Sequence, residues 1–191
     1  MDIFQLLTIE NRQQWRHWLE QYHANKRLCW IVVKRCKPKN DGAFYYLEAV
    51  EEALCFGWID STVKKMPNGM PAQRFSPRRP NSQWSELNKE RVRRLERLGK
   101  MTNAGRAVLP KMDPTSFTID PIILHALRVD ETVWKRFQSF PPLYQRVRID
   151  VLQRRKKYDA IFHNGLKKLL ENTRNNVMYG EWNDDGRLLE R

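Results

Sequence analysis

The sequence predicts an α+β fold that is mainly helical, with a small three-stranded antiparallel sheet and a helical C-terminal subdomain. β-Branched and aromatic residues gather in residues 28–35, which is typical of a strand, and residues 62–66 and 72–76 are expected to be the two strands of a hairpin. Asn68-Gly69 lies between the last two segments and favours a hairpin, because both residues tolerate a positive φ. The remaining signals are helical, and they dominate the chain after residue 111.

The elements of the N-terminal half follow from capping residues and periodicity. Thr8 has a hydroxyl that can cap a helix over residues 10–23. A second helix is expected over residues 45–58, where apolar side chains recur at helical spacing. A basic helix begins at Ser82 or Ser85 and ends at Gly99, a residue that readily adopts the left-handed conformation. A short helix then begins at Thr102.

The C-terminal half reads as four helices, over residues 121–128, 131–137, 142–155 and 158–173. We therefore expect a core domain over residues 1–110, which holds the Gly57-Trp58-Ile59-Asp60 and Arg74–Pro80 motifs. A helical subdomain is expected over residues 111–178, and a frayed tail over residues 179–191.

Composition indicates a reduced, cytoplasmic protein. The chain has 191 residues, 30% of them charged, and a mean hydropathy of -0.73. It contains no apolar run of the length that a membrane span needs and no secretory signal pattern at its N-terminus. Three cysteines without a CxxC pair are typical of free thiols. We expect no membrane span, and the composition makes no prediction of the oligomeric state.

The positive charge is concentrated in the middle of the chain. The formal net charge is +13. Residues 1–60 hold eight Lys and Arg against eight Asp and Glu, whereas residues 61–110 hold twelve against three. A local excess of this kind favours an anionic partner, although a solvated basic helix and hairpin would give the same pattern.

Polar residues inside apolar helix faces suggest a ligand site. Asn88 and Arg91 fall within the apolar stripe of the basic helix, and Glu51 falls within that of the preceding helix. A pair between Arg91 and either Glu51 or Asp60 would satisfy these groups, as a structural staple or as part of a pocket for an anion. The candidate ligand-binding residues are Glu51, Trp58, Asp60, Arg74, Arg78, Ser82, Trp84, Asn88 and Arg91.

Two alternative functions stay open. The basic hairpin and the helix over residues 85–98 would suit nonspecific nucleic-acid binding, with phosphate contacts from Lys64, Lys65, Arg78, Arg79, Arg93 and Arg94. A hydrolase-type enzyme would use Glu51 or Asp60 as acid or base. The sequence has no metal-ligand spacing, phosphate loop or nucleophile elbow, so we expect no cofactor and no metal, and we assign no catalytic residue.

The central block, EALCFGWID followed by QRFSPRRPNSQWSELNKERVRRLERLGKMTNAGRAVL, resembles the YdeI/OmpD-associated family of bacteriocin-protection proteins. The resemblance implies an uncharacterised cytoplasmic protein of the antimicrobial stress response. Its partner would be an anionic small molecule or an acidic protein. The sequence departs from the family pattern near its C-terminus, where Ala160, Ile161, His163 and Asn164 stand in place of a helix rich in threonine and arginine.

Overall fold

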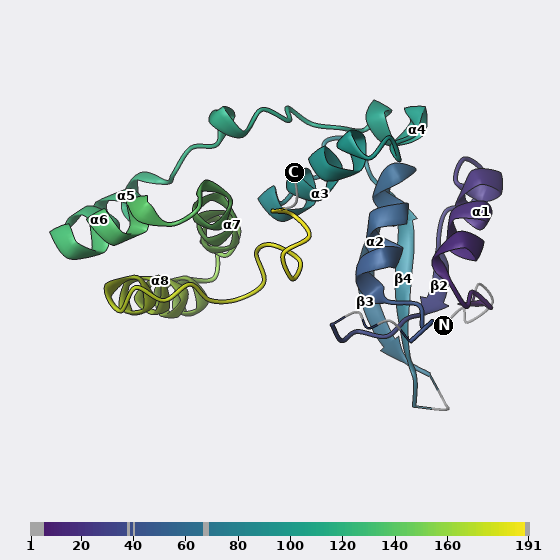
Figure 1. Cartoon of the computed structure of the whole chain (residues 1–191), viewed down its shortest axis with the longest axis horizontal. Helices are drawn as coiled ribbons and strands as arrows, with labels where there is room; N and C mark the ends of the chain where they lie inside the picture. Colours follow the sequence, from purple (N-terminus) through teal and green to yellow (C-terminus); the bar gives the residue numbers. More distant parts are fainter. Residues whose placement is uncertain (1–5, 38, 40, 67–68, 190–191) are drawn as a thin grey trace. The chain divides into compact units, whose positions relative to one another are not determined.

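A computed structural model describes residues 6–37, 39, 41–66 and 69–189. The α+β prediction is confirmed, because helices and one sheet make up the regular structure (Figure 1). The chain separates into two compact units. The first contains Met1–Gln83 and Arg91–Pro110, and the second contains Trp84–Glu90 and Lys111–Arg191. The three segments expected as domains, 1–110, 111–178 and 179–191, stay a prediction.

The expected three-stranded antiparallel sheet was wrong in one respect, because the described sheet has four strands and is mixed. Its order is β1-β2-β4-β3, with β1 (Leu6–Leu7), β2 (Cys29–Val32), β4 (Pro71–Pro77) and β3 (Trp58–Lys65). β1 runs parallel to β2, while β2 and β3 both run antiparallel to β4. A two-residue strand is too short to show alternation, so no local pattern predicted β1. Pro67 and Asn68 of the predicted turn lie outside the described residues.

Local signals explain the helices of the first unit. In α1 (Arg12–Tyr22), Asn11 is the N-cap in place of the expected Thr8, and its side chain accepts a hydrogen bond from the Gln14 amide. The expected helix over residues 45–58 divides into α2 (Tyr46–Cys55) and the start of β3. Gly57 makes the reversal with a φ of 74°. Two more helices, α3 (Glu86–Arg97) and α4 (Asn103–Ala107), follow the sheet.

The core of the first unit lies between the sheet and two helices. Trp15 of α1 packs against Phe75 of β4 with 5.3 Å between ring centres. The Trp15 indole also donates a hydrogen bond of 3.0 Å to the Ala49 carbonyl of α2. Figure 1 shows α1 and α2 in front of the strands, so both helices cover the same face of the sheet.

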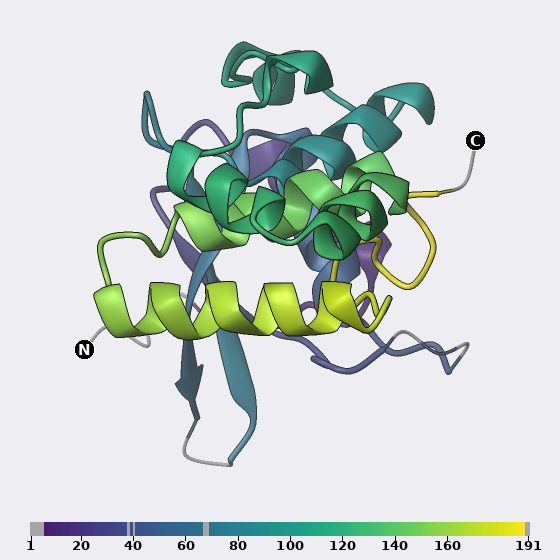
Figure 2. The same cartoon turned by 90° about the vertical axis from the view of Figure 1, so that its left-hand side faces the viewer.

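The second unit is helical, as expected. It contains η1 (Pro114–Ser116), α5 (Pro121–Arg128), α6 (Glu131–Ser139), α7 (Pro142–Gln153) and α8 (Asp159–Arg174). Asp120 and Asp130 cap α5 and α6, because each carboxylate accepts hydrogen bonds from the first free amides. α8 contacts each of the other three long helices, and Figure 2 shows it in yellow-green beside them.

The prediction that residues 179–191 form a frayed tail is corrected for residues 179–189, which the structure describes. Leu188 is only 5% exposed and packs in a cluster with Leu143 and Val147 of α7. Trp182 packs against the same cluster and meets Tyr144 edge to face. These two apolar side chains hold the segment against its unit, because their burial offsets the loss of chain entropy. Over the described ranges, no helix combines the length and apolar character that would let it cross a membrane.

Candidate functional site

Glu51 belongs to an enclosed ionic network in the first unit. Its carboxylate is 1% exposed and contacts Arg12 Nη1 at 2.8 Å and Arg94 Nη1 at 3.1 Å. Glu52, 2% exposed, contacts Arg12 Nε at 2.5 Å and Arg16 Nη1 at 2.8 Å. Burial pushes the pKa of Arg12 down, but the charges of Glu51 and Glu52 outweigh this effect, so the pKa is raised. The network staples α1, α2 and α3 together.

This enclosure is unfavourable to acid–base catalysis by Glu51. A general base must reach the proton that it removes, and the enclosed Glu51 carboxylate lies against the guanidinium groups of Arg12 and Arg94. The same pairing gives Arg94, expected to contact phosphate, a structural partner inside the protein. In the described part of the chain, no group of three His, Cys, Asp or Glu side chains could hold a metal ion.

Asp60 lies in a second, half-buried cluster. Its Oδ2 accepts a hydrogen bond of 2.7 Å from the Tyr46 hydroxyl, and Arg35 stacks 4.2 Å above the Tyr46 ring. Burial raises the pKa of Tyr46, and the Asp60 charge raises it further. Arg91 lies close enough for its charge to act in the opposite direction. The expected pair between Arg91 and either Glu51 or Asp60 stays a prediction.

Other predicted ligand residues serve the core and the loop. Trp58 is 1% exposed, and its indole donates a hydrogen bond to the His23 carbonyl, so it is a core residue. Arg78 is also buried, and its Nη1 contacts the Ser82 hydroxyl and the Gln83 carbonyl within the loop. Trp84 and Asn88 belong to the second unit. Nine residues predicted as one site therefore take several different roles.

The face of the sheet opposite α1 and α2 carries a cluster that we call the basic sheet face, defined as Trp30, Ser61, Lys64, Arg74 and Ser76. Successive side chains of a strand point to opposite faces, so Arg74 and Ser76 point away from the helices that Phe75 contacts. Trp30 is the register partner of Arg74. Lys64 and Arg74 are among the residues predicted from the sequence, whereas Trp30 is not, because register between strands is a property of the folded chain.

Three contacts order the basic sheet face. The Lys64 ammonium lies 4.9 Å from the centre of the Trp30 ring. Arg74 Nη1 donates to the Ser61 hydroxyl at 3.2 Å and to the Ser76 hydroxyl at 3.5 Å. Lys64 and Arg74 are both half-buried, so each cation is positioned and still reaches solvent. Lys65 and Arg79, which complete the expected hairpin cations, are exposed, and Arg93 is half-buried.

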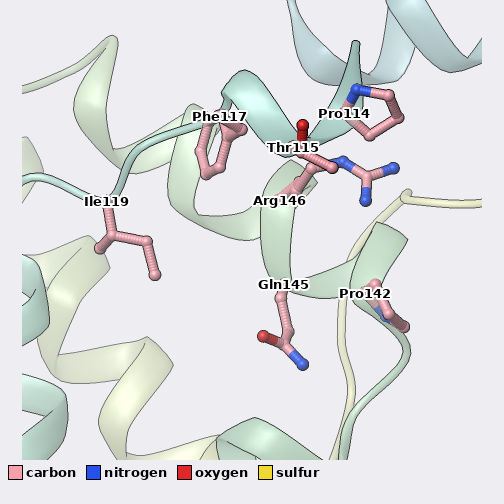
Figure 3. Close-up of a pocket in the computed structure, with 7 residues that line it drawn as sticks. All are labelled: Pro114, Thr115, Phe117, Ile119, Pro142, Gln145 and Arg146. Carbon is pink, nitrogen blue, oxygen red and sulfur yellow. The ribbon is translucent and has the colours of Figure 1, made fainter.

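The second unit has a hollow of about 320 Å³ that sequence analysis did not select (Figure 3). Phe117 and Ile119 form its apolar wall, and Gln145 and Arg146 of α7 are its main polar side chains. The charge of Arg146 is offset, because Nε lies 3.4 Å from Glu86 and Nη2 lies 3.2 Å from Glu90. The hollow is therefore less suited to an anion than the basic sheet face.

The comparisons with known proteins identify a family without an assigned activity. The model of a family described as a domain of unknown function, DUF8412, matches residues 7–108, more than half of the chain. The chain belongs to this family. Neither the curated proteins nor the solved structures gave a match. The DUF8412 match carries no link to the YdeI/OmpD-associated family, so that resemblance and the protection it implies stay predictions.

Proposed function

We propose that this member of the DUF8412 family is an anion-binding protein and that its site is the basic sheet face. One observation carries the proposal. Within the described ranges, no carboxylate pairs with Lys64 or Arg74, whose contacts are a tryptophan ring and two hydroxyls. These contacts position both cations without neutralising them. A ligand with several negative oxygens would supply the missing countercharge.

Other cations of the chain show why this pattern is informative. Arg12 and Arg16 share buried carboxylates, and Arg106 forms a two-pronged pair with Glu96 at 2.8 and 2.9 Å. Each of these arginines, which join elements of the protein, meets a carboxylate. The basic sheet face instead provides hydroxyls from Ser61 and Ser76, which can also donate to a bound oxygen.

The charge distribution supports a polyanion over a single carboxylate. Twelve Lys and Arg against three Asp and Glu lie in residues 61–110, which include β3, β4 and α3. All three of those carboxylates are already paired, Glu86 with Lys89, Glu90 with Arg146 and Glu96 with Arg106. Lys64 and Arg74 therefore belong to a strongly positive segment of the sequence, and a ligand with several phosphate groups would match that charge better than one carboxylate.

The proposal is tested with inorganic polyphosphate, a ligand that carries negative charge but has no aromatic rings. Its affinity is measured by titration calorimetry for the unsubstituted protein, Lys64→Gln, Arg74→Gln and the double variant. Arg128→Gln is the matched control, because Arg128 lies 5.0 Å from the Trp134 ring in the second unit. We expect the double variant to bind roughly tenfold or more weakly, since each lost charge contact costs about 1 kcal/mol. Equal losses in the double variant and the control would contradict the proposal.

A further inference from the structure

The geometry points to single-stranded nucleic acid as the ligand of the basic sheet face, with a base stacked on Trp30 and phosphates at Lys64 and Arg74. This inference rests on the proposed function, because it names the anion that the same face would bind. It also gives the Trp30 ring a role in binding. A site that recognised only negative charge would not need an aromatic ring.

The positions of the three side chains follow from the sheet order. β4 lies between β2 and β3, and the row Val32, Ala72, Lys64 crosses the three strands. Lys64 nevertheless reaches the Trp30 ring on the far strand. Its stem must pass over Ala72, which is 0% exposed and small enough to lie beneath it. Arg74 lies directly opposite Trp30 on β4. One ring and two cations thus share a single patch.

The spacing suits a strand of nucleotides. Arg74 and Lys64 are diagonal neighbours on paired strands, about 7–8 Å apart at their backbones, so their long side chains can reach separate phosphates. Every base has a π face, and stacking on an aromatic side chain combined with a positively charged groove is the general mode of single-strand binding. A duplex keeps its base faces inside the helix, and an acidic peptide need not present a planar ring. Both would leave Trp30 unused.

The Lys64 ammonium occupies the place that a base would take. Trp30 is 8% exposed, and the Lys64 ammonium lies over its ring. A lysine side chain has four rotatable bonds, so its head can swing to a phosphate at the edge of the ring while the backbone stays in place. The same movement exposes the stacking surface and creates a charge contact.

Fluorescence anisotropy separates this inference from the proposed function. A labelled single-stranded oligonucleotide of mixed sequence is compared with its duplex and with polyphosphate. The variants are Trp30→Phe and Trp30→Leu. Trp134→Leu is the matched control, because Trp134 also has a cation, that of Arg128, over its ring. We expect the single strand to bind about tenfold more tightly than the duplex. Trp30→Leu should weaken single-strand binding about tenfold and leave polyphosphate binding unchanged, while Trp30→Phe keeps most of the affinity.

Each contrary result has a separate meaning. Equal affinity for single strand and duplex, or equal effects of Trp30→Leu and Trp134→Leu, would overturn the inference. Polyphosphate binding that depends on Lys64 and Arg74 would still support the proposed function in that case. If single-strand binding does not depend on Trp30 and polyphosphate binding does not depend on Lys64 and Arg74, the proposed function itself is overturned. If Trp30→Leu lowers the melting temperature strongly, the decision rests on Trp30→Phe and on the ratio of single strand to duplex.

Discussion

At the scale of single residues, the partner of each cation distinguishes the cations that stabilise the fold from those that could bind a ligand. Arg12, Arg16 and Arg94 meet the carboxylates of Glu51 and Glu52 in the interior of the first unit. The amino-acid types alone placed Arg94 with the nucleic-acid candidates and Glu51 with the ligand site. Pairing between distant helices decides their roles, and that pairing depends on tertiary packing that no local pattern records.

Glu51→Gln should destabilise the protein by about 3 kcal/mol, because it leaves guanidinium groups without their buried countercharge. Urea unfolding followed by circular dichroism measures the loss. Glu131→Gln is the control, since the Glu131–Lys135 pair is largely exposed at 79% and 71% and should contribute less than about 0.5 kcal/mol. Similar losses in the two variants would show that burial of the network adds nothing.

The three cysteines should differ sharply in reactivity. Cys36 is exposed, whereas burial, followed by the charge of Glu52, raises the pKa of Cys55 to about 12. Burial also raises the pKa of Cys29. At pH 8 the native protein should therefore react rapidly with a disulfide reagent at Cys36 alone, and at all three thiols in denaturant. Mass spectrometry of the labelled peptides would reveal rapid labelling at Cys29 or Cys55, the outcome that this prediction excludes.

At the scale of elements, α4 docks on the end of α2 through backbone groups. The Thr102 hydroxyl and amide both donate to the Cys55 carbonyl, at 2.6 and 3.2 Å. The Gly105 amide in turn donates to the Thr102 hydroxyl. A Cβ on Gly105 would overlap that same carbonyl, so the glycine is required by close approach of two backbones.

Gly105→Ala should lower the free energy of unfolding by about 1–3 kcal/mol, although alanine normally favours a helix over glycine by about 1 kcal/mol. Gly165→Ala, within α8, is the comparison, because its new Cβ would meet only the movable end of the Leu152 side chain. Denaturant unfolding should show a clearly smaller loss for Gly165→Ala, or a gain. A stabilised Gly105→Ala protein would mean that the two helices do not approach this closely.

Helix caps made the second unit more predictable than the sheet. Asp120 and Asp130 mark the first turns of α5 and α6, and the start of each helix agrees with the sequence prediction. The hairpin of β3 and β4 was also predictable from a local signal, the Asn68-Gly69 pair between the two strand segments. The short β1 and the register that brings Trp30 beside Arg74 depend on long-range pairing, which no local pattern specifies. The tryptophan of the candidate site could therefore not be selected from the sequence.

The C-terminal segment offers two adjacent leucines that test its packing. Leu188 is 5% exposed and Leu189 is 52% exposed. Leu188→Ala should cost about 2–3 kcal/mol through the lost burial and the cavity left beside Leu143 and Val147. Leu189→Ala should change stability by less than about 0.5 kcal/mol. Thermal unfolding of both variants distinguishes the packed segment from a frayed one, for which neither substitution would matter.

At the scale of the whole molecule, positive charge is concentrated in the part of the sequence that supplies the candidate site. The net charge of +13 arises mainly from residues 61–110, which supply Lys64 and Arg74 of the basic sheet face. Charge spread along a chain raises the affinity for any polyanion, while a built site makes that affinity depend on particular side chains. This difference separates a binding protein from a generally basic surface.

The salt dependence of polyphosphate binding tests that difference most directly. The slope of log affinity against log salt concentration is measured for the unsubstituted protein, for the Lys64→Gln/Arg74→Gln double variant and for Arg128→Gln. We predict that the slope becomes shallower by roughly one for each cation removed from the basic sheet face and stays unchanged in Arg128→Gln. Equal slopes for all three proteins would contradict an anion site on this face.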